Sequence, residues 1–306
     1  MHYMSRKGMA ILLTVLGLAA FSAVAPPPTG AAPAPSAHAA TPAPASGRAV
    51  GGPATAPPQR VPVLLYHHLD PGADGTNGAI ITPAAFEAQM AWLAEHGYTA
   101  IDTRDLAAWL LAGGSLPARP VLITFDDGYR SVYQYAYPVL RKYGLKMTLF
   151  LTGSKVGTRP GLYDYITWDE IREMREAGYL DLQSHTFNAH YFVSGQAVLT
   201  AWDREQIRAD SAQLARAFQE HGIAPPKAYA YPYGAYDAEV IEAIAADGFQ
   251  LGFTVARGLV ERGSAPLMLP RLTVYPWTPF CAFQAMVTGA DPAVTCSPPP
   301  SGALRP

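Results

Sequence analysis

The feature that most constrains the fold is a regular alternation of short apolar runs and amphipathic segments along residues 61–274. The short apolar runs are typical of buried strands. The segments between them have helical spacing, and the first begins at Thr82-Pro83 and ends at Gly97, which are start and stop signals of a helix. We predict strands at 61–66, 98–101, 120–125, 147–151, 179–184, 228–231, 250–254 and 268–274, and helices at 83–96, 103–112, 131–143, 168–177, 202–221 and 237–247.

Strands that alternate with helices form parallel βαβ units, in which helices cover the sheet. About seven such units in roughly 230 residues fit a distorted, closed or nearly closed (β/α) barrel better than a three-layer sandwich. In such barrels the chemistry lies at the carboxyl ends of the strands. Polar motifs that directly follow a predicted strand are therefore the candidates for a functional site.

The residues before this region predict export. A basic pair, Arg6-Lys7, precedes an apolar run over 9–24 that ends in small residues, which is typical of a secretory signal peptide at 1–25. A second candidate cleavage site is Ala-His-Ala at 37–39. An uncleaved membrane anchor is the alternative, because about 16 apolar residues almost span a bilayer. We expect a periplasmic or extracellular location.

Proline marks the flanks of the folded region. Ten of the 29 prolines lie in 26–60 and five in 292–306, whereas the other 14 are spread over 61–291. A segment rich in proline and alanine, with no acidic residue, has little apolar surface to bury. We therefore predict a Pro/Ala-rich linker at 26–60, one folded domain at 61–296 and a flexible tail at 297–306.

Charge and cysteine content exclude several classes of protein. The chain has 22 basic and 24 acidic residues, so nucleic-acid binding is not expected. The predicted domain alone has 17 basic and 24 acidic residues, a net charge of −7 that favours a neutral or cationic polymer over an acidic one. Cys281 and Cys296 are too few for a disulfide scaffold or a four-thiolate zinc site. In an exported protein we expect one disulfide between them, and two free thiols are the alternative.

Two adjacent carboxylates, Asp126 and Asp127, directly follow the predicted strand at 120–125. They repel each other, so a stable arrangement often has one of them bound to a cation. Gly128 permits a sharp turn after them. Taken alone, the motif also fits a solvated Asp-Asp-Gly turn.

Two histidines, His185 and His190, follow the predicted strand at 179–184. Their spacing of five does not place them on one face of a helix, but a loop that runs into a turn lets both rings converge. Together with one carboxylate they would form a site with two His and one Asp ligand, open to water and substrate. A histidine pair without a metal is the alternative for this motif alone.

Two more polar segments follow predicted strands. Tyr66-His67-His68 ends the first strand, and a histidine there suits a third metal ligand, a general acid or a packed residue. The segment Tyr229–Gly234 offers aromatic rings for a sugar cleft and backbone N–H groups for an oxyanion. A rigid loop filled with core aromatics is the alternative for this segment.

The motifs TFDDG at 124–128, SHTFNAH at 184–190 and YPYG at 231–234, in this order, resemble the signature of the polysaccharide deacetylases, the NodB-homology family 4 carbohydrate esterases. The resemblance covers roughly 61–275 and implies a NodB-type barrel and a polysaccharide deacetylase domain at 61–296. By motif, Asp126 resembles the general base, and Asp127, His185 and His190 resemble the ligands of one divalent ion. The backbone of Tyr233 resembles the oxyanion contact.

The sequence departs from the common family pattern at two positions. Ala230 stands where many members have an arginine that holds the base, and no histidine follows His221, although many members take their acid from a late Leu-x-His motif. The branch that acts on poly-β-1,6-N-acetylglucosamine resembles a circularly permuted version with an early Tyr-His. His67 therefore resembles the catalytic acid, and His68 should point to the opposite side of the strand. Arg271, on a late strand, is a candidate to orient the base.

The resemblance implies a metal-dependent hydrolase that removes N-acetyl groups from an exopolysaccharide, first of all poly-β-1,6-N-acetylglucosamine. Zinc is the first choice of metal, with cobalt, nickel or manganese as alternatives. Other substrates are chitin oligomers, peptidoglycan or an O-acetylated glycan, and a non-catalytic carbohydrate-binding protein is the alternative from another class. The expected partner is the polysaccharide, with membrane contact only through an uncleaved signal segment. The aromatic candidates for sugar binding are Phe187, Tyr231, Tyr236 and Trp277.

Overall fold

The computed structural model describes residues 59–296, so the predicted signal peptide, most of the linker and the tail lie outside the described residues. Its centre is a ring of seven parallel strands, namely β2 (Val63–Tyr66), β6 (Pro120–Phe125), β7 (Met147–Leu151), β8 (Leu180–Ser184), β11 (Ala228–Ala230), β12 (Leu251–Arg257) and β14 (Leu269–Thr273). Their order is β2-β14-β12-β11-β8-β7-β6, and β2 also pairs with β6, which closes the ring. The predicted (β/α) barrel of about seven units is confirmed.

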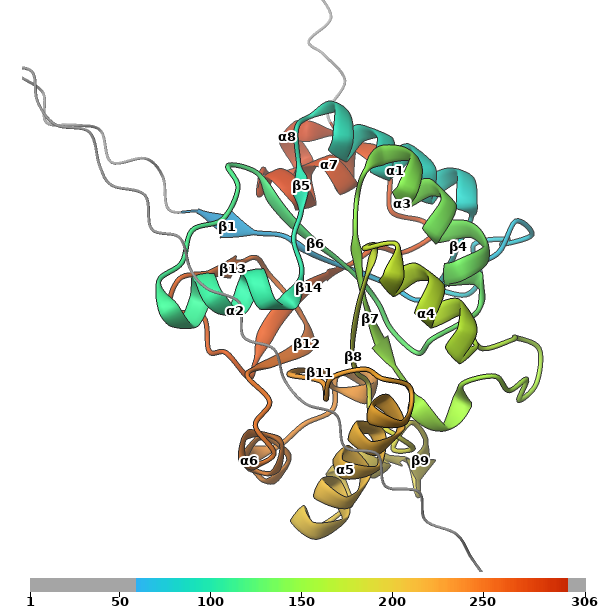
Figure 1. The fold of residues 1–306 in the computed structure, drawn as a ribbon. Helices are drawn as coiled ribbons and strands as arrows, with labels where there is room; N and C mark the ends of the chain where they lie inside the picture. The colour runs from blue at the N-terminus through green and yellow to red at the C-terminus, as the bar shows by residue number, and fades with distance from the viewer. Residues whose placement is uncertain (1–58, 297–306) are drawn as a thin grey trace, which may run out of the picture. The chain divides into compact units, whose positions relative to one another are not determined.

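Helices surround this barrel (Figure 1). Several begin at the capping residues that the sequence indicates: Thr82 Oγ1 accepts a hydrogen bond from the backbone N–H of Ala85, and Asp102 and Thr167 form capping boxes. The helices are α1 (Pro83–Glu95), α2 (Thr103–Ala112), α3 (Tyr137–Tyr143), α4 (Trp168–Glu176), α5 (Arg204–Glu220), α6 (Ala238–Ala246), α7 (Phe280–Thr288) and α8 (Pro292–Thr295).

The structure differs from the predicted elements at several places. The helix predicted at 131–143 begins as a π-helix over Val132–Ala136 and continues as α3, whose second residue, Pro138, has no N–H to donate. The strand predicted at 98–101 is β5 (Thr99–Ala100), which pairs with the start of β6 outside the ring. Helices α7 and α8 and three short strand pairs were not predicted: β1 (Arg60–Val61) with β13 (Val260–Glu261), β3 (His68–Leu69) with β4 (Ile80–Ile81), and β9 (Phe192–Val193) with β10 (Gln196–Ala197).

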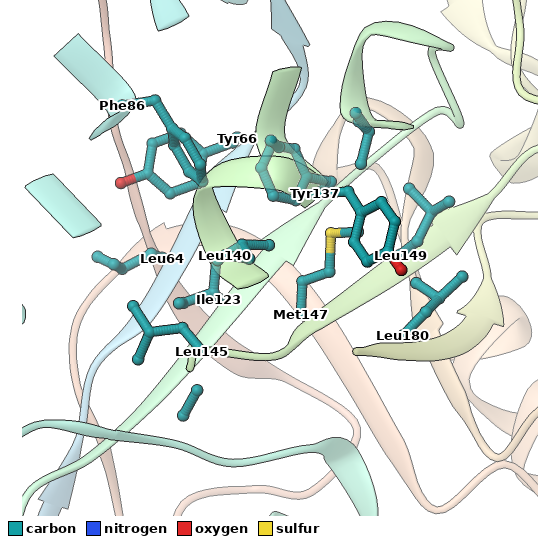
Figure 2. Packing of buried hydrophobic residues seen from close by; sticks show 14 of the residues in the cluster. Leu64, Tyr66, Phe86, Ile123, Tyr137, Leu140, Leu145, Met147, Leu149 and Leu180 are labelled. Atoms are coloured by element: carbon teal, nitrogen blue, oxygen red, sulfur yellow. The ribbon is translucent and has the colours of Figure 1, made fainter. Parts of the chain in front are cut away.

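The buried apolar side chains of the described residues form three clusters, and two of them contain most of the barrel strands. Outward-facing side chains of the strands, such as Leu64, Ile123 and Leu149, pack against α1 and α3 in one of them (Figure 2). Inward-facing side chains form a second cluster that Leu106 and Trp109 of α2 complete. The interior of the barrel is therefore a packed core rather than a channel, and ligands must bind at an end of it.

Cys281 of α7 and Cys296, just after α8, form a disulfide. This bond ties the last described residue back to a helix. Among the described residues, no helix has the length and apolar character needed to span a bilayer. The predicted signal segment lies outside the residues that were searched.

Candidate metal centre and active site

Closure of the barrel brings the predicted site residues together at one end of it. The strands are all parallel, so their carboxyl ends lie at one end of the barrel. Asp126 and Asp127 follow β6, His67 follows β2, and His185 follows β8. Because β2 lies between β6 and β14 in the ring, the first and last strands of the domain bring His67 and Arg271 next to Asp126.

Asp127, His185 and His190 each offer one ligand atom, and the three atoms lie within 4.8 Å of one another. Asp127 Oδ1 is 3.0 Å from Nε2 of His190 and 3.6 Å from Nε2 of His185. This oxygen is buried and accepts no well-directed hydrogen bond from a described residue. A buried acceptor of this kind normally has a partner, so the three residues fit a divalent cation.

Hydrogen bonds to the outer ring nitrogens fix the orientation of both histidines. Nδ1 of His185 lies 2.8 Å from the carbonyl oxygen of Ala230, and Nδ1 of His190 lies 3.1 Å from the hydroxyl of Tyr233. His185 therefore donates through Nδ1 and keeps a lone pair on Nε2, facing Asp127. Such outer hydrogen bonds are the usual way in which a protein orients a metal-binding histidine.

Burial and charge set the protonation states of these ligands. Burial lowers the pKa of His185 to about 4, so the ring is neutral and able to bind a metal at neutral pH. Burial alone would raise the pKa of Asp127, but the histidines around it, His190 first and then His185 and His67, hold that pKa well below its ordinary value. The site therefore presents one carboxylate and neutral His185.

The backbone is strained where it forms this site. Among the described residues, four non-glycine residues have positive φ, and three of them belong to the site motifs: Asp127 (73°), Thr186 (84°) and Tyr233 (59°). Such conformations persist only where surrounding contacts enforce them, and they concentrate at functional sites. Gly128 has φ 91°, and a Cβ there would lie 2.7 Å from the side chain of Leu151. No other residue fits this turn without movement.

Asp126 forms a buried ion pair with Arg271. Nη1 and Nη2 of the guanidinium each donate to one carboxylate oxygen at 2.8 Å, and Nε donates to the carbonyl oxygen of Thr254. Arg271 is only 1% exposed and Asp126 only 2%. Burial alone would raise the pKa of Asp126, but the charge and hydrogen bonds of Arg271, together with the nearby His185 and His67, outweigh burial and hold this pKa below its ordinary value.

The two consecutive histidines after β2 face different surroundings. His67 is half-buried and acts electrostatically on both Asp126 and Asp127. His68 is buried, its Nδ1 lies 2.8 Å from the hydroxyl of Ser131, and its ring packs against Tyr129 and Tyr163. Successive residues of a strand point to opposite sides, and this is the reason that only His67 faces the carboxylates.

The four aromatic candidates for sugar binding have different exposures. Tyr231 is fully buried and donates its hydroxyl to the carbonyl oxygen of Leu267, so its ring offers no free face to a sugar. Tyr236 stacks on Tyr231, and Phe187 packs against the core. Trp277 is 58% exposed and stacks on Tyr275 with an angle of 4° between the ring planes.

Sequence reasoning missed Asp210 of α5, which shapes the loop between the two histidines. This residue is 6% exposed. Its carboxylate accepts hydrogen bonds from the hydroxyl of Thr186 and from the backbone N–H groups of Phe187 and Asn188, the last two at 2.7 Å. Asp210 lies on the buried face of α5 together with Ile207 and Leu214. The position of Asp210 within the apolar stripe of a predicted helix could have indicated a buried carboxylate with a structural role.

We expect the Asp210→Asn variant to bind the divalent metal roughly 10- to 100-fold more weakly. An amide has one acceptor oxygen, and its NH2 group would face N–H donors that now have a carboxylate oxygen. Competition with a chelating dye measures this affinity, and circular dichroism verifies that the variant is folded. The matched control is Glu205→Gln, an exposed residue of the same helix. Equal metal affinity in Asp210→Asn and wild type would show that the loop keeps its shape without the carboxylate.

Comparisons with known proteins agree with this geometry. A family model described as polysaccharide deacetylase matches residues 113–252. YxkH of Bacillus subtilis (strain 168), whose name assigns it to the polysaccharide deacetylases, is 33% identical over 233 residues, which are 76% of this chain and 78% of that protein.

Two further relatives extend the comparison. The poly-β-1,6-N-acetyl-D-glucosamine N-deacetylase of Escherichia coli (strain K12) is 25% identical over 240 residues, and the match spans 68% of this chain but only 36% of that protein. The structure of IcaB from Ammonifex degensii superposes with a TM-score of 0.65 at 26% identity, over 75% of this chain and 96% of the other. The identity to YxkH over most of both chains, together with the shared barrel, shows that the chain belongs to the polysaccharide deacetylase family of NodB-homology enzymes.

Proposed function

We propose that this enzyme is a metal-dependent N-deacetylase of poly-β-1,6-N-acetylglucosamine that releases acetate from acetylated glucosamine units. The observation that carries the proposal is the placement of an ionised carboxylate, Asp126, beside a set of three metal ligands. Arg271 pairs with Asp126, whereas Asp127 lies in the ligand set. Asp126 is therefore left to act as a base, and Asp127 is available to bind the metal. Metal-assisted hydrolysis of an amide by water uses such a division between a general base and a metal ligand.

Asp127, His185 and His190 would hold the divalent cation, with zinc as the first choice for two imidazoles and one carboxylate. When bound, such a cation supplies Lewis-acid polarisation of the acetyl carbonyl and increases the acidity of water. Asp126 removes a proton from the attacking water, for which its low pKa keeps it ionised. Arg271 holds the two carboxylate oxygens of Asp126 in place for this step.

Collapse of the tetrahedral intermediate requires a proton for the departing nitrogen. His67 gives this proton to the amine of the sugar, since it acts electrostatically on both aspartates and lies outside the set of three ligand candidates. The backbone N–H of Tyr233 is our candidate for stabilising the oxyanion. The products are acetate and a glucosamine unit.

Two features support poly-β-1,6-N-acetylglucosamine as the substrate. The Escherichia coli relative is named for this activity, and so is a Staphylococcus epidermidis relative that is 27% identical over 196 residues. The acid candidate also comes from the first strand of the barrel, as the resemblance to that branch implies. We further propose that the enzyme acts outside the cytoplasm, because Arg6-Lys7 and the apolar run at 9–24 are typical of a signal peptide.

Acetate release from a panel of defined glycans tests this function. We expect turnover of β-1,6-linked N-acetylglucosamine oligomers to exceed that of chitin oligomers, peptidoglycan fragments and O-acetylated xylan. A chelator should abolish the activity, and zinc, cobalt, nickel or manganese should restore it to different degrees. Activity that persists after metal removal would contradict the metal-dependent mechanism, and a preference for another glycan would change the substrate while leaving the chemistry intact.

A further inference from the structure

A ladder of aromatic rings leads from the metal centre to the protein surface. The ring of His190 lies 4.4 Å from the ring of Tyr233, and Tyr233 lies 4.3 Å from Phe192 of β9, both measured between ring centroids. We call Tyr233 and Phe192 the aromatic ladder. Its inner residue, Tyr233, is hydrogen-bonded to a metal-ligand candidate, because the Tyr233 hydroxyl lies 3.1 Å from Nδ1 of His190.

The outer end of this ladder is open to solvent. Phe192 is 55% exposed and Tyr233 is 42% exposed, and the neighbouring Tyr191 and Val255 are also exposed. Val255 lies against the turn of Tyr233, since a Cβ added at Gly234 would be 2.4 Å from its side chain. Soluble proteins seldom leave large apolar side chains grouped in this way without a binding role.

The hairpin that carries Phe192 is built to hold it in place. Its strands β9 and β10 pair with Phe192 opposite Ala197, and Ala197 is buried. The two residues of the turn, Ser194 and Gly195, have φ of 52° and 82°, which is the geometry of the tightest hairpin loops. The backbone N–H of Val198 donates to the carbonyl oxygen of Tyr191, which extends the pairing of the two strands at the base of the hairpin.

We propose that the aromatic ladder is a glycan subsite, on which a pyranose unit next to the unit being deacetylated stacks its apolar face. This inference rests on the proposed function and extends it to the neighbouring sugar of the chain. The C–H groups of a β-linked glucosamine ring form a flat apolar surface, and aromatic side chains with exposed faces are suited to such a surface. Since Tyr233, the inner residue of the ladder, contacts His190, a polymer lying on the ladder extends to the metal centre. A protein or a lipid surface bound to the ladder would block access of the substrate to that centre, so a glycan is the occupant that fits.

Binding of β-1,6-linked N-acetylglucosamine oligomers, from dimer to hexamer, tests the subsite. Calorimetry on the metal-free protein measures Kd without turnover, because stacking does not require the metal. We expect Phe192→Ala to weaken hexamer binding about tenfold and to remove most of the gain in affinity from dimer to hexamer. Phe192→Tyr should retain this gain. The matched control is Phe280→Ala on α7, a phenylalanine of similar exposure, 43%, outside the ladder.

Three results would overturn the proposal: hexamer binding by Phe192→Ala equal to wild type, an equal loss in Phe280→Ala, or a loss of metal affinity in Phe192→Ala as large as its loss of glycan affinity. The last result would show that Phe192 acts by supporting His190 instead. Acetate release by the wild-type enzyme is measured in parallel. If glycan binding depends on Phe192 but no acetate is released, the proposed function is contradicted and the subsite is supported. If acetate is released but Phe192→Ala binds the hexamer as wild type does, only the subsite is contradicted.

Discussion

The Asp126→Asn variant is expected to lose about 10²- to 10⁴-fold in kcat while it still binds the metal and the glycan. The amide cannot take the proton of the attacking water, and Asp126 is not one of the three residues that form the ligand set. Acetate release gives the rate, and a chelating dye gives the metal affinity. The matched control is Asp169→Asn, an aspartate whose side chain is 82% exposed and pairs with Arg172 on the same helix.

The separate readouts of this variant distinguish a base from a structural residue. A base affects kcat and leaves metal affinity near that of wild type, whereas a residue needed for the shape of the site lowers both. If Asp126→Asn released acetate as fast as wild type, another group would have to remove the proton, and the assignment of Asp126 would fail.

The second large effect is expected for Arg271→Ala, which should lower the free energy of unfolding by about 3–5 kcal/mol and strongly reduce turnover. The loss comes from an ion pair in which both side chains are almost fully buried, with 0% of the Arg271 side chain and 3% of the Asp126 side chain exposed. Without the guanidinium, the carboxylate of Asp126 stays buried with no positive partner. Urea denaturation at neutral pH measures the change.

A double variant provides the control for this prediction. Arg271→Ala combined with Asp126→Asn removes the unpaired charge, so it should be less destabilised than Arg271→Ala alone. Arg271→Lys keeps the charge but loses the two parallel hydrogen bonds, so it should recover part of the stability and less of the activity. Additive losses in the double variant would contradict a direct energetic coupling between the two side chains.

The pH dependence gives a readout that a purely structural role of Arg271 would not change. In wild type the pKa of Asp126 lies below its ordinary value, so the pair is fully formed above that ordinary value and its contribution is lost as pH falls through the lowered pKa. In Arg271→Ala, burial is opposed only by the nearby His185 and His67, so the pKa of Asp126 should rise. The acidic limb of kcat/KM should therefore move to higher pH. An unmoved limb would show that Arg271 does not tune this carboxylate.

The barrel was predictable because each of its strands and helices is encoded by neighbouring residues and the same pattern repeats along the chain. Each apolar run and each capped amphipathic segment is encoded by neighbouring residues, such as Thr82 at the start of α1 and Gly97 after it. The motif residues that the structure brings together were also predictable, since Asp127, His185 and His190 all follow runs that read as strands. Parallel topology then requires these loops to meet at one end of the barrel.

Residues whose role depends on distant parts of the chain were harder to find. Arg271 was named only as a replacement for an absent arginine, and the pairing of β14 with β2 next to β6 gives it two hydrogen bonds to a residue 145 positions earlier. Asp210 and Phe192 were missed, because their roles depend on the residues that they contact. These contacts come from other parts of the chain and cannot be read from the neighbouring sequence. Tyr231 was a candidate for stacking on sugar, but the cluster formed with Tyr229 and Tyr236 buries it.

The sequence by itself thus determined the strands of the barrel, the helices between them and the motifs that carry the chemistry, because hydrophobic periodicity, capping and strand-end polar residues act over a few neighbouring positions. The resemblance implied roles for these residues, but only the tertiary structure decided their contacts: Arg271 pairs with Asp126, Asp127 lies among the histidines, and His68 lies against Ser131. These choices depend on closure of the ring by β2, β6 and β14. Burial then turns the resulting contacts into fixed protonation states, which no local pattern in the sequence contains.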